Sequence, residues 1–283
     1  MNKTQFLTNL FDILRGYTFD IVENTQYGTF YISNTDNSQY WNLFLVNQPC
    51  NEAHLVEIEK RFLYYKRTPS IYFSTESYQE ELQTYLLLRK YSLSHKDSFM
   101  FHDGLNIPAH HNKQIKQVTS EKSLDEFIDT ANKCYVKNDP QGPYGELHQF
   151  VATMRGAWHN LSPKDKIALY TTYNDQGDAV AVSILSSGNN IGYITTVGSL
   201  PSVRGEGYGK HATYHCLQES VKRGNKYHCL ATEKDTYPYE FYKRLGFKNE
   251  FTSVCYVSAS ITRITASSAD MIARPIPIPG NES

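Results

Sequence analysis

A glycine-rich turn between a β-branched run and an amphipathic stretch constrains this chain more than any other feature. Residues 191–199 are apolar and β-branched and predict a strand, and residues 210–222 predict a helix. Gly205, Gly207 and Gly209 lie between them at alternate positions. A turn without side chains that leads into a helix exposes unpaired N–H groups, and the helix dipole adds partial positive charge. This arrangement predicts a binding site for an anion such as phosphate.

Two common phosphate-binding motifs do not fit this turn. The glycine spacing differs from the G-x-G-x-x-G of dinucleotide-binding folds, and His211 follows Lys210 where the Walker motif requires Ser or Thr. A tight turn whose glycines serve only packing is the simplest alternative. The pattern that does fit is R-x-x-G-x-G, formed by Arg204, Gly207 and Gly209. It resembles motif A of the GNAT family of N-acetyltransferases, which hold the pyrophosphate of acetyl-CoA on this turn.

A second segment further along the chain resembles motif B of the same family, N-x-x-A-x-x-L-Y-x-x-x-G-F. Tyr242, Gly246 and Phe247 match this motif. Three positions depart from it, because the usual Asn, Ala and Leu are replaced by Asp235, Pro238 and Phe241. The two motifs together extend the resemblance over roughly residues 113–258.

The resemblance implies an acetyl-CoA site and assigns residues to it. The expected cofactor-binding residues are Val197, Gly198, Ser199, Arg204, Gly205, Glu206, Gly207, Tyr208, Gly209, Lys210 and Asp235. Backbone groups of the first three would lie along pantetheine and donate to the thioester oxygen. Arg204 would add a fixed positive charge at the mouth of the turn. Asp235 would begin and cap the motif-B helix, and could also touch the pantetheine amides.

Candidate catalytic residues are fewer. Tyr242 occupies the position where many family members place the general acid for the CoA thiolate, and a packed aromatic ring is the alternative. The strand before the glycine turn carries no carboxylate, so the general base stays open. Glu233 is the first candidate, with a solvated surface residue as the alternative, and Asp139 and Glu146 are weaker candidates. His215 is expected to pack in the core, and a water relay would need no named residue.

The first hundred residues show a similar order of elements without the glycine turn. From Tyr40 onward the pattern predicts a strand, a helix over 51–67, a strand over 70–74, a helix over 80–91 and a strand over 98–102. Residues 87–101 and 242–256 share the order helix, polar turn and apolar strand, which indicates an internal repeat. The equivalent turn at residues 46–53 lacks R-x-x-G-x-G, so we expect it not to bind pyrophosphate.

The sequence therefore predicts an α/β fold with mixed sheets. We expect two GNAT-like domains, each a twisted mixed β-sheet flanked by helices, with a splayed-strand acetyl-CoA site in the second. The expected divisions are a degenerate domain at 1–103, a linker at 104–114, a catalytic domain at 115–258 and a Pro-rich tail at 259–283. The splay should fall between residues 191–199 and 227–231. The tandem layout is similar to mycothiol synthases and to secreted bacterial effectors of the VipF type.

The composition of the chain indicates which kinds of binding partner to expect. A net charge of −1 gives no electrostatic case for binding nucleic acid or an anionic membrane. Because no apolar run of membrane-spanning length and no signal peptide are visible, we expect a cytoplasmic protein, or a secreted effector with a host protein partner. The five cysteines are scattered without metal-ligand spacing, so we expect reduced core thiols and no metal.

These features together predict an acetyl-CoA-dependent N-acetyltransferase. It would move an acetyl group to a primary amine by direct attack on the thioester, and the acceptor would be a protein lysine, a protein N-terminus or a small molecule. The alternative is a non-catalytic acyl-CoA-binding module that acts as a sensor or scaffold. The absence of a carboxylate on the strand before the glycine turn is the main argument for that alternative.

Overall fold

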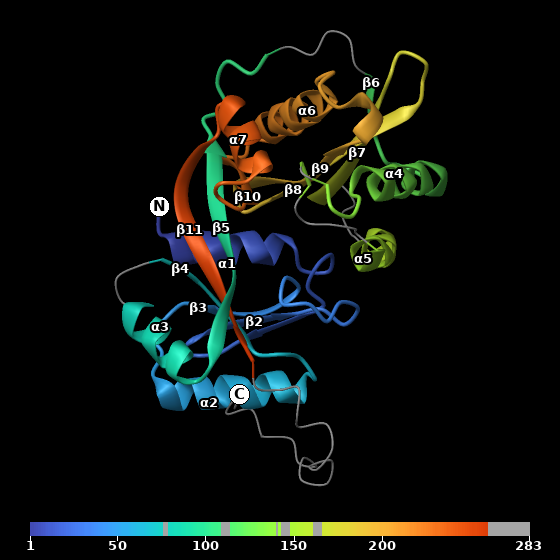
Figure 1. Cartoon of the computed structure of the whole chain (residues 1–283). Helices are drawn as coiled ribbons and strands as arrows, with labels where there is room; N and C mark the ends of the chain where they lie inside the picture. Colours follow the sequence, from blue (N-terminus) through green and yellow to red (C-terminus); the bar gives the residue numbers. More distant parts are fainter. Residues whose placement is uncertain (76–78, 109–113, 140, 143–147, 161–165, 260–283) are drawn as a thin grey trace, which may run out of the picture.

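A single mixed sheet of eleven strands dominates the computed structural model, which describes residues 1–75, 79–108, 114–139, 141–142, 148–160 and 166–259 (Figure 1). The strand order in this sheet is β1-β2-β3-β4-β11-β5-β10-β9-β8-β7-β6. Helices flank the sheet, so the chain has the mixed α/β class that the sequence predicts. Most of the tail at 259–283 lies outside the described residues.

The elements follow the chain in two comparable sets. The first set comprises α1 (Lys3–Ile13), β1 (Ile21–Asn24), β2 (Gly28–Ile32), β3 (Asn42–Val46), α2 (Glu52–Tyr64), β4 (Ser70–Ser74), α3 (Gln79–Leu88) and β5 (Tyr91–His102). The second set comprises β6 (Gln114–Gln117), α4 (Glu121–Cys134), α5 (His148–Asn160), β7 (Ile167–Tyr173), β8 (Ala179–Gly188), β9 (Ile191–Ser199), a 3-10 turn (Pro201–Val203), α6 (Tyr208–Lys222), β10 (Tyr227–Thr232), α7 (Tyr237–Arg244) and β11 (Lys248–Ser258).

The two halves of the sheet exchange their last strands. β5, from the first half of the chain, lies between β10 and β11, and β11, from the second half, lies between β4 and β5. All of these neighbours pair antiparallel, and β5 and β11 run side by side through the middle of the molecule (Figure 1). Each half of the sheet is therefore completed by a strand from the other half.

Alternating side chains give the sheet two apolar faces. On one face, α1 packs against the central strands through Phe6, Leu10 and Phe11, and α4 and α5 pack against β7 and β8. On the other face, α2 and α3 cover β2, β3, β4 and β11, and α6 and α7 cover the strands of the second half. All five cysteines are buried with free thiols. None of the helices in the described part of the chain is long and apolar enough to cross a membrane.

The boundary between α3 and β5 differs from the prediction. The sequence pattern predicts a helix through residue 91 and a strand from residue 98. In the structure the helix ends at Leu88, Lys90 has φ 64°, and the strand already begins at Tyr91. A left-handed residue ends a helix, and the largely polar residues 92–97 then join the strand because β11 pairs with all of them except Ser94. Pairing with a distant strand thus overrides local polarity.

The helix start in the first half differs chemically from the glycine turn of the second half. Asn51 caps α2 by accepting from the N–H of His54, and the His54 side chain accepts from the N–H of Asn51. This capping box occupies donors that an anion would need. It fits the expectation that the first half does not bind pyrophosphate at this turn.

Candidate active site

β9 and β10 separate partway along their length. The two parallel strands pair at Ile191–Tyr227, Gly192–His228 and Tyr193–Cys229, and within the described strands their pairing ends there. β9 nevertheless continues to Ser199 and β10 to Thr232. The splay predicted between these two strands is therefore present.

A bulge in β9 accompanies the splay. Val182 and Ile184 of β8 pair with Gly198 and Thr195 of β9, so β9 carries one extra residue between these pairs. Within this bulge Thr196 has φ 51°, a left-handed conformation that a β-branched residue rarely adopts. Such strain persists only where the surrounding structure enforces it, and it often marks a functional site.

Two cavities of about 230 Å³ each meet at the splay. The first extends over the glycine turn and the start of α6, and Ser199, Gly207 and Gly209 are among its lining residues. The second extends between the separated strands, and its lining includes Thr195, Ala231 and Thr232. Both cavities are lined by Tyr135, Gln141, Gly142, Val197, Pro238 and Tyr242. A ligand in the first cavity can thus approach a ligand in the second.

The glycine turn has the backbone geometry of an anion site. Gly205 and Gly207 have φ of 89° and 86°, a region that favours glycine, and Gly207 is the N-cap of α6. The first bond inside the helix runs from the N–H of His211 to the carbonyl of Gly207. The N–H groups of Gly209 and Lys210 precede that bond and have no partner within the helix, so they can bind an anion at the cavity.

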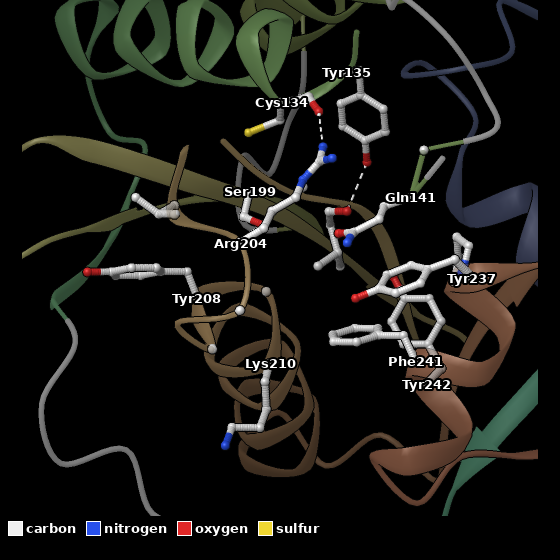
Figure 2. Close-up of a pocket in the computed structure, with 18 residues that line it drawn as sticks. Cys134, Tyr135, Gln141, Ser199, Arg204, Tyr208, Lys210, Tyr237, Phe241 and Tyr242 are labelled. Atoms are coloured by element: carbon white, nitrogen blue, oxygen red, sulfur yellow. Dashed lines mark hydrogen bonds between the residues drawn. The ribbon is translucent and has the colours of Figure 1, made fainter. Parts of the chain in front are cut away.

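Arg204 is not the free cation that the sequence suggests. Its guanidinium forms a two-pronged ion pair with Asp139, one contact being Nη1 to Oδ1 at 2.7 Å. It also donates to the carbonyl of Cys134 at 3.3 Å, the bond that Figure 2 shows. The side chain of Asp139 is 1% exposed, and its hydrogen bonds to the guanidinium hold its carboxyl pKa below the usual value. Asp139 is therefore a poor candidate for the general base. The pair joins the glycine turn to the loop after α4.

That loop and the end of α4 form a wall of the site. Tyr135 donates from its hydroxyl to the carbonyl of Val197 at 3.0 Å, as Figure 2 shows. Gly198 permits this approach, because a Cβ there would lie 2.8 Å from both Cys134 Cβ and Tyr135 Cε2. Gln141 and Gly142 continue the wall over both cavities.

Tyr242 lies where both cavities meet. It is half-buried on α7, and its ring packs edge-on against Phe241 and Phe247 with centroids 5.1 and 5.9 Å away. Phe241 and Tyr237 line the first cavity beside it (Figure 2), and Pro238 lines both cavities. The position allows the phenol to serve either cavity.

Other predicted site residues lie further away. Glu233 is half-buried at the end of β10, and it is not among the residues that line the two cavities; Glu146 lies outside the described residues. Asp235 is exposed with φ 64° and does not cap α7, whose N-cap is Thr236. The predicted cap is wrong because Asp235 adopts a left-handed turn one residue too early.

The side chains of Glu206, Tyr208 and Lys210 lie around the glycine turn in different surroundings. Lys210 lines the first cavity, but its amine points away from Arg204 in Figure 2. Tyr208 is buried against Val180 and Ala181, and Glu206 is exposed. His215 packs edge-on against Tyr170 at 4.6 Å, as expected of a core residue.

Several lining residues escaped the sequence analysis. Tyr135, Gln141 and Gly142 follow α4 in a segment with no recognisable motif, and Thr195, Thr196 and Thr232 look like ordinary strand residues. Only the splay distinguishes them, because it exposes strand positions that a continuous sheet would pair. Among the described residues, no group of three potential metal ligands comes together.

The sequence model of the acetyltransferase (GNAT) family matches residues 124–247, which run from within α4 to the end of α7 and include the lining of both cavities. No curated protein matches the chain. Solved structures with a similar fold include a GCN5-related N-acetyltransferase from Kribbella flavida, with a TM-score of 0.63, 15% identity and coverage of 90% of this chain and 95% of that one.

A functionally unknown conserved protein from Staphylococcus epidermidis has a TM-score of 0.63 at 12% identity and covers 86% of this chain and 94% of its own. A tandem GNAT protein from the clavulanic acid biosynthesis pathway has a TM-score of 0.56 at 11% identity, with coverage of 82% and 78%. These similarities extend over both halves of the sheet and concern the fold. The glycine turn and the splay both lie within residues 124–247, the segment that matches the model of the GNAT acetyltransferase family.

Proposed function

We propose that this protein transfers the acetyl group of acetyl-CoA to a primary amine by direct attack of the amine on the thioester. The observation that carries this proposal is the meeting of two cavities at the splay of β9 and β10. One cavity contains an anion-binding helix start, and the other reaches the same point from between the strands. A module that only holds acyl-CoA would need the first cavity alone.

The proposed binding residues of acetyl-CoA lie on the glycine turn and on the end of β9. The N–H groups of Gly209 and Lys210 would bind the pyrophosphate, as helix starts do for phosphate groups. Backbone groups of residues 197–199 would lie along the pantetheine arm and donate to the thioester oxygen, where negative charge develops.

Tyr242 is the proposed general acid. It lines both cavities, so its hydroxyl could donate a proton to the sulfur that leaves when the amide bond forms. For the general base, Glu233 remains our residue candidate, and a water molecule in the second cavity is the other route. The acceptor would be a small amine, a protein lysine or a protein N-terminus that enters the second cavity.

Gly209 offers the sharpest test of this proposal. Gly207 has a positive φ, so any side chain there strains the backbone, whereas a Cβ on Gly209 would meet only Phe241, at 3.7 Å. Gly209→Ala should therefore fold and bind CoA. Gly209→Glu would place a longer, negatively charged side chain at the anion site.

Calorimetry with CoA and a thiol-release assay with acetyl-CoA and an amine panel test both variants. We expect one CoA per wild-type chain, amine-dependent thiol release, and at least about tenfold weaker CoA binding for Gly209→Glu. Equal CoA affinity for Gly209→Glu and Gly209→Ala would contradict the proposed pyrophosphate site. CoA binding without transfer to any amine would instead support the non-catalytic alternative.

A further inference from the structure

Asp97 lies on β5, a strand from the first half of the chain that pairs with a strand lining the second cavity. β5 pairs with β10 at Ser98–Thr232 and Phe99–Ala231, and both β10 residues line that cavity. Side chains alternate along a strand, so Asp97 is on the same face as Phe99 and Ala231. Diagonal neighbours on adjacent antiparallel strands lie about 7–8 Å apart. Asp97 is not itself a lining residue, so an acceptor must extend over about this distance from the lining at Ala231 to meet the carboxylate.

The surroundings of Asp97 hold its carboxylate in place without a permanent cation. Tyr72 donates from its hydroxyl to Oδ2 at 2.8 Å, and His95 Nε2 lies 3.7 Å from the same oxygen. Tyr72 is only 2% exposed and His95 only 7%. His95 is the one ion-pair partner of Asp97 in the described parts of the chain. Among the residues that the structure describes, no Lys or Arg thus forms an ion pair with this carboxylate.

A carboxylate in this position is costly without a positive partner. Phe99 lies two residues along β5 in the central apolar cluster, and burial raises the pKa of Asp97. An unneutralised carboxylate in low dielectric is unfavourable unless hydrogen bonds or a cation compensate. The Tyr72 hydroxyl compensates in part. The side chain keeps 26% of its surface accessible, so a cationic ligand can reach it.

The loop between β2 and β3 brings the first half of the chain to the same region. Thr35 hydrogen-bonds Thr153 of α5 at 3.1 Å, and Tyr40 stacks on His95 with ring centroids 4.5 Å apart. Gln39 donates to Ser94 on β5 at 3.1 Å. This loop therefore connects the start of β5 with α5, on the face of the sheet where α4 and α5 pack.

We propose that Asp97 binds a second, positively charged group of the acceptor, and that the preferred acceptors are small diamines. One amine of such a molecule would enter the second cavity as the nucleophile, while the other stays protonated at Asp97. The first half of the chain would then complete the acceptor site, although it lacks the glycine turn. This inference rests on the acetyl-transfer function proposed above.

Matched amines test this assignment. The probes are 1,4-diaminobutane and 1,5-diaminopentane, with n-butylamine and n-pentylamine as singly charged controls. Wild-type protein should acetylate the diamines with kcat/KM about ten- to a hundredfold higher, the range expected of a hydrogen bond to a charged group. Asp97→Asn should lose most of this preference through KM, while its CoA affinity stays unchanged. Tyr72→Phe, which removes the donor to Asp97, should reduce the preference less.

Controls separate this proposal from acetyl transfer itself. Asp175→Asn, in the exposed hairpin turn after β7, should behave as wild type. Circular dichroism and urea midpoints establish that each variant folds. Binding of 1,4-diaminobutane to the CoA complex by calorimetry gives a readout that does not depend on activity, and Asp97→Asn should weaken it at least about tenfold.

The outcomes distinguish the two proposals. Transfer to all four amines with equal efficiency, or equal losses for both amine classes in Asp97→Asn, would overturn the role of Asp97 and leave acetyl transfer standing. Asp97-dependent binding of the diamine without any transfer would support the site and overturn the proposed reaction.

Discussion

The ion pair between Arg204 and Asp139 should stabilise the protein asymmetrically. Arg204→Gln leaves a carboxylate that is 1% exposed without its cation, which costs about 3–5 kcal/mol for a buried pair. Asp139→Asn leaves a guanidinium that is 20% exposed and can recruit water, so we expect only about 1.5–3 kcal/mol, the range for a hydrogen bond to a charged group. The Arg204 variant should therefore be the less stable of the two.

Urea unfolding of the wild type, both single variants and the double variant measures the coupling. We expect the double variant to lose about 1–3 kcal/mol less free energy of unfolding than the two single losses added together. Additive losses would refute the view that the two side chains act as a unit. Equal losses from the single variants would refute the argument from burial.

The same pair predicts a pH dependence. The pKa of Asp139 is lower in the folded protein than in the unfolded chain, where it is near 3.9. Its contribution is therefore complete above about pH 4 and disappears as the pH falls toward the folded pKa. The stability difference between the wild type and Arg204→Gln should shrink in that range, and a difference that stays constant down to pH 3 would argue against the pair as its cause.

Three further predictions concern the site and the exchanged strands. Tyr242→Phe should lower kcat at least about tenfold with a nearly constant acetyl-CoA dissociation constant, and loss of rate and binding together would indicate a structural role for the ring. Gly198→Ala should lower the free energy of unfolding in urea by about 1–3 kcal/mol and weaken CoA binding, because a Cβ would lie 2.8 Å from Cys134 and Tyr135. The control Gly156→Ala on α5, where a Cβ would meet no atom within 4 Å, should leave the stability unchanged or raise it slightly. Deleting residues 1–103 should leave an insoluble or unfolded chain, since it removes β5 from between β10 and β11; a soluble fragment that binds CoA would show that β11 can pair with β10 directly.

The glycine turn was predictable from sequence because its cause is local, whereas the splay was expected only from the resemblance to the GNAT family. Alternate glycines before an amphipathic stretch require a particular backbone path, and Gly205 and Gly207 adopt the positive φ that the pattern suggests. The partner of Arg204 was not predictable in the same way. Asp139 lies 65 residues earlier, on a loop whose composition carries no pattern, so only tertiary structure brings the charges together.

Strand exchange also has no local signal. Hydrophobic alternation in residues 248–257 predicts a buried strand, but it does not say which neighbours that strand has. The polar residues 92–97 resemble a turn, and they become a strand only through pairing with β11. Asp97 was not predicted as a site residue for this reason, because a carboxylate in an expected turn would be exposed to solvent.

The central place of β11 also sets the order in which the molecule can assemble during synthesis. β4 and β5 leave the ribosome early, but the strand that separates them ends at Ser258, about 150 residues after β5. At about 5–20 residues per second, the first half would wait roughly 10–30 s before its sheet could close. Open strand edges pair readily with other chains, so this interval is when the nascent protein is most exposed to aggregation. The part of the chain that is made first is therefore among the last to reach its final pairing.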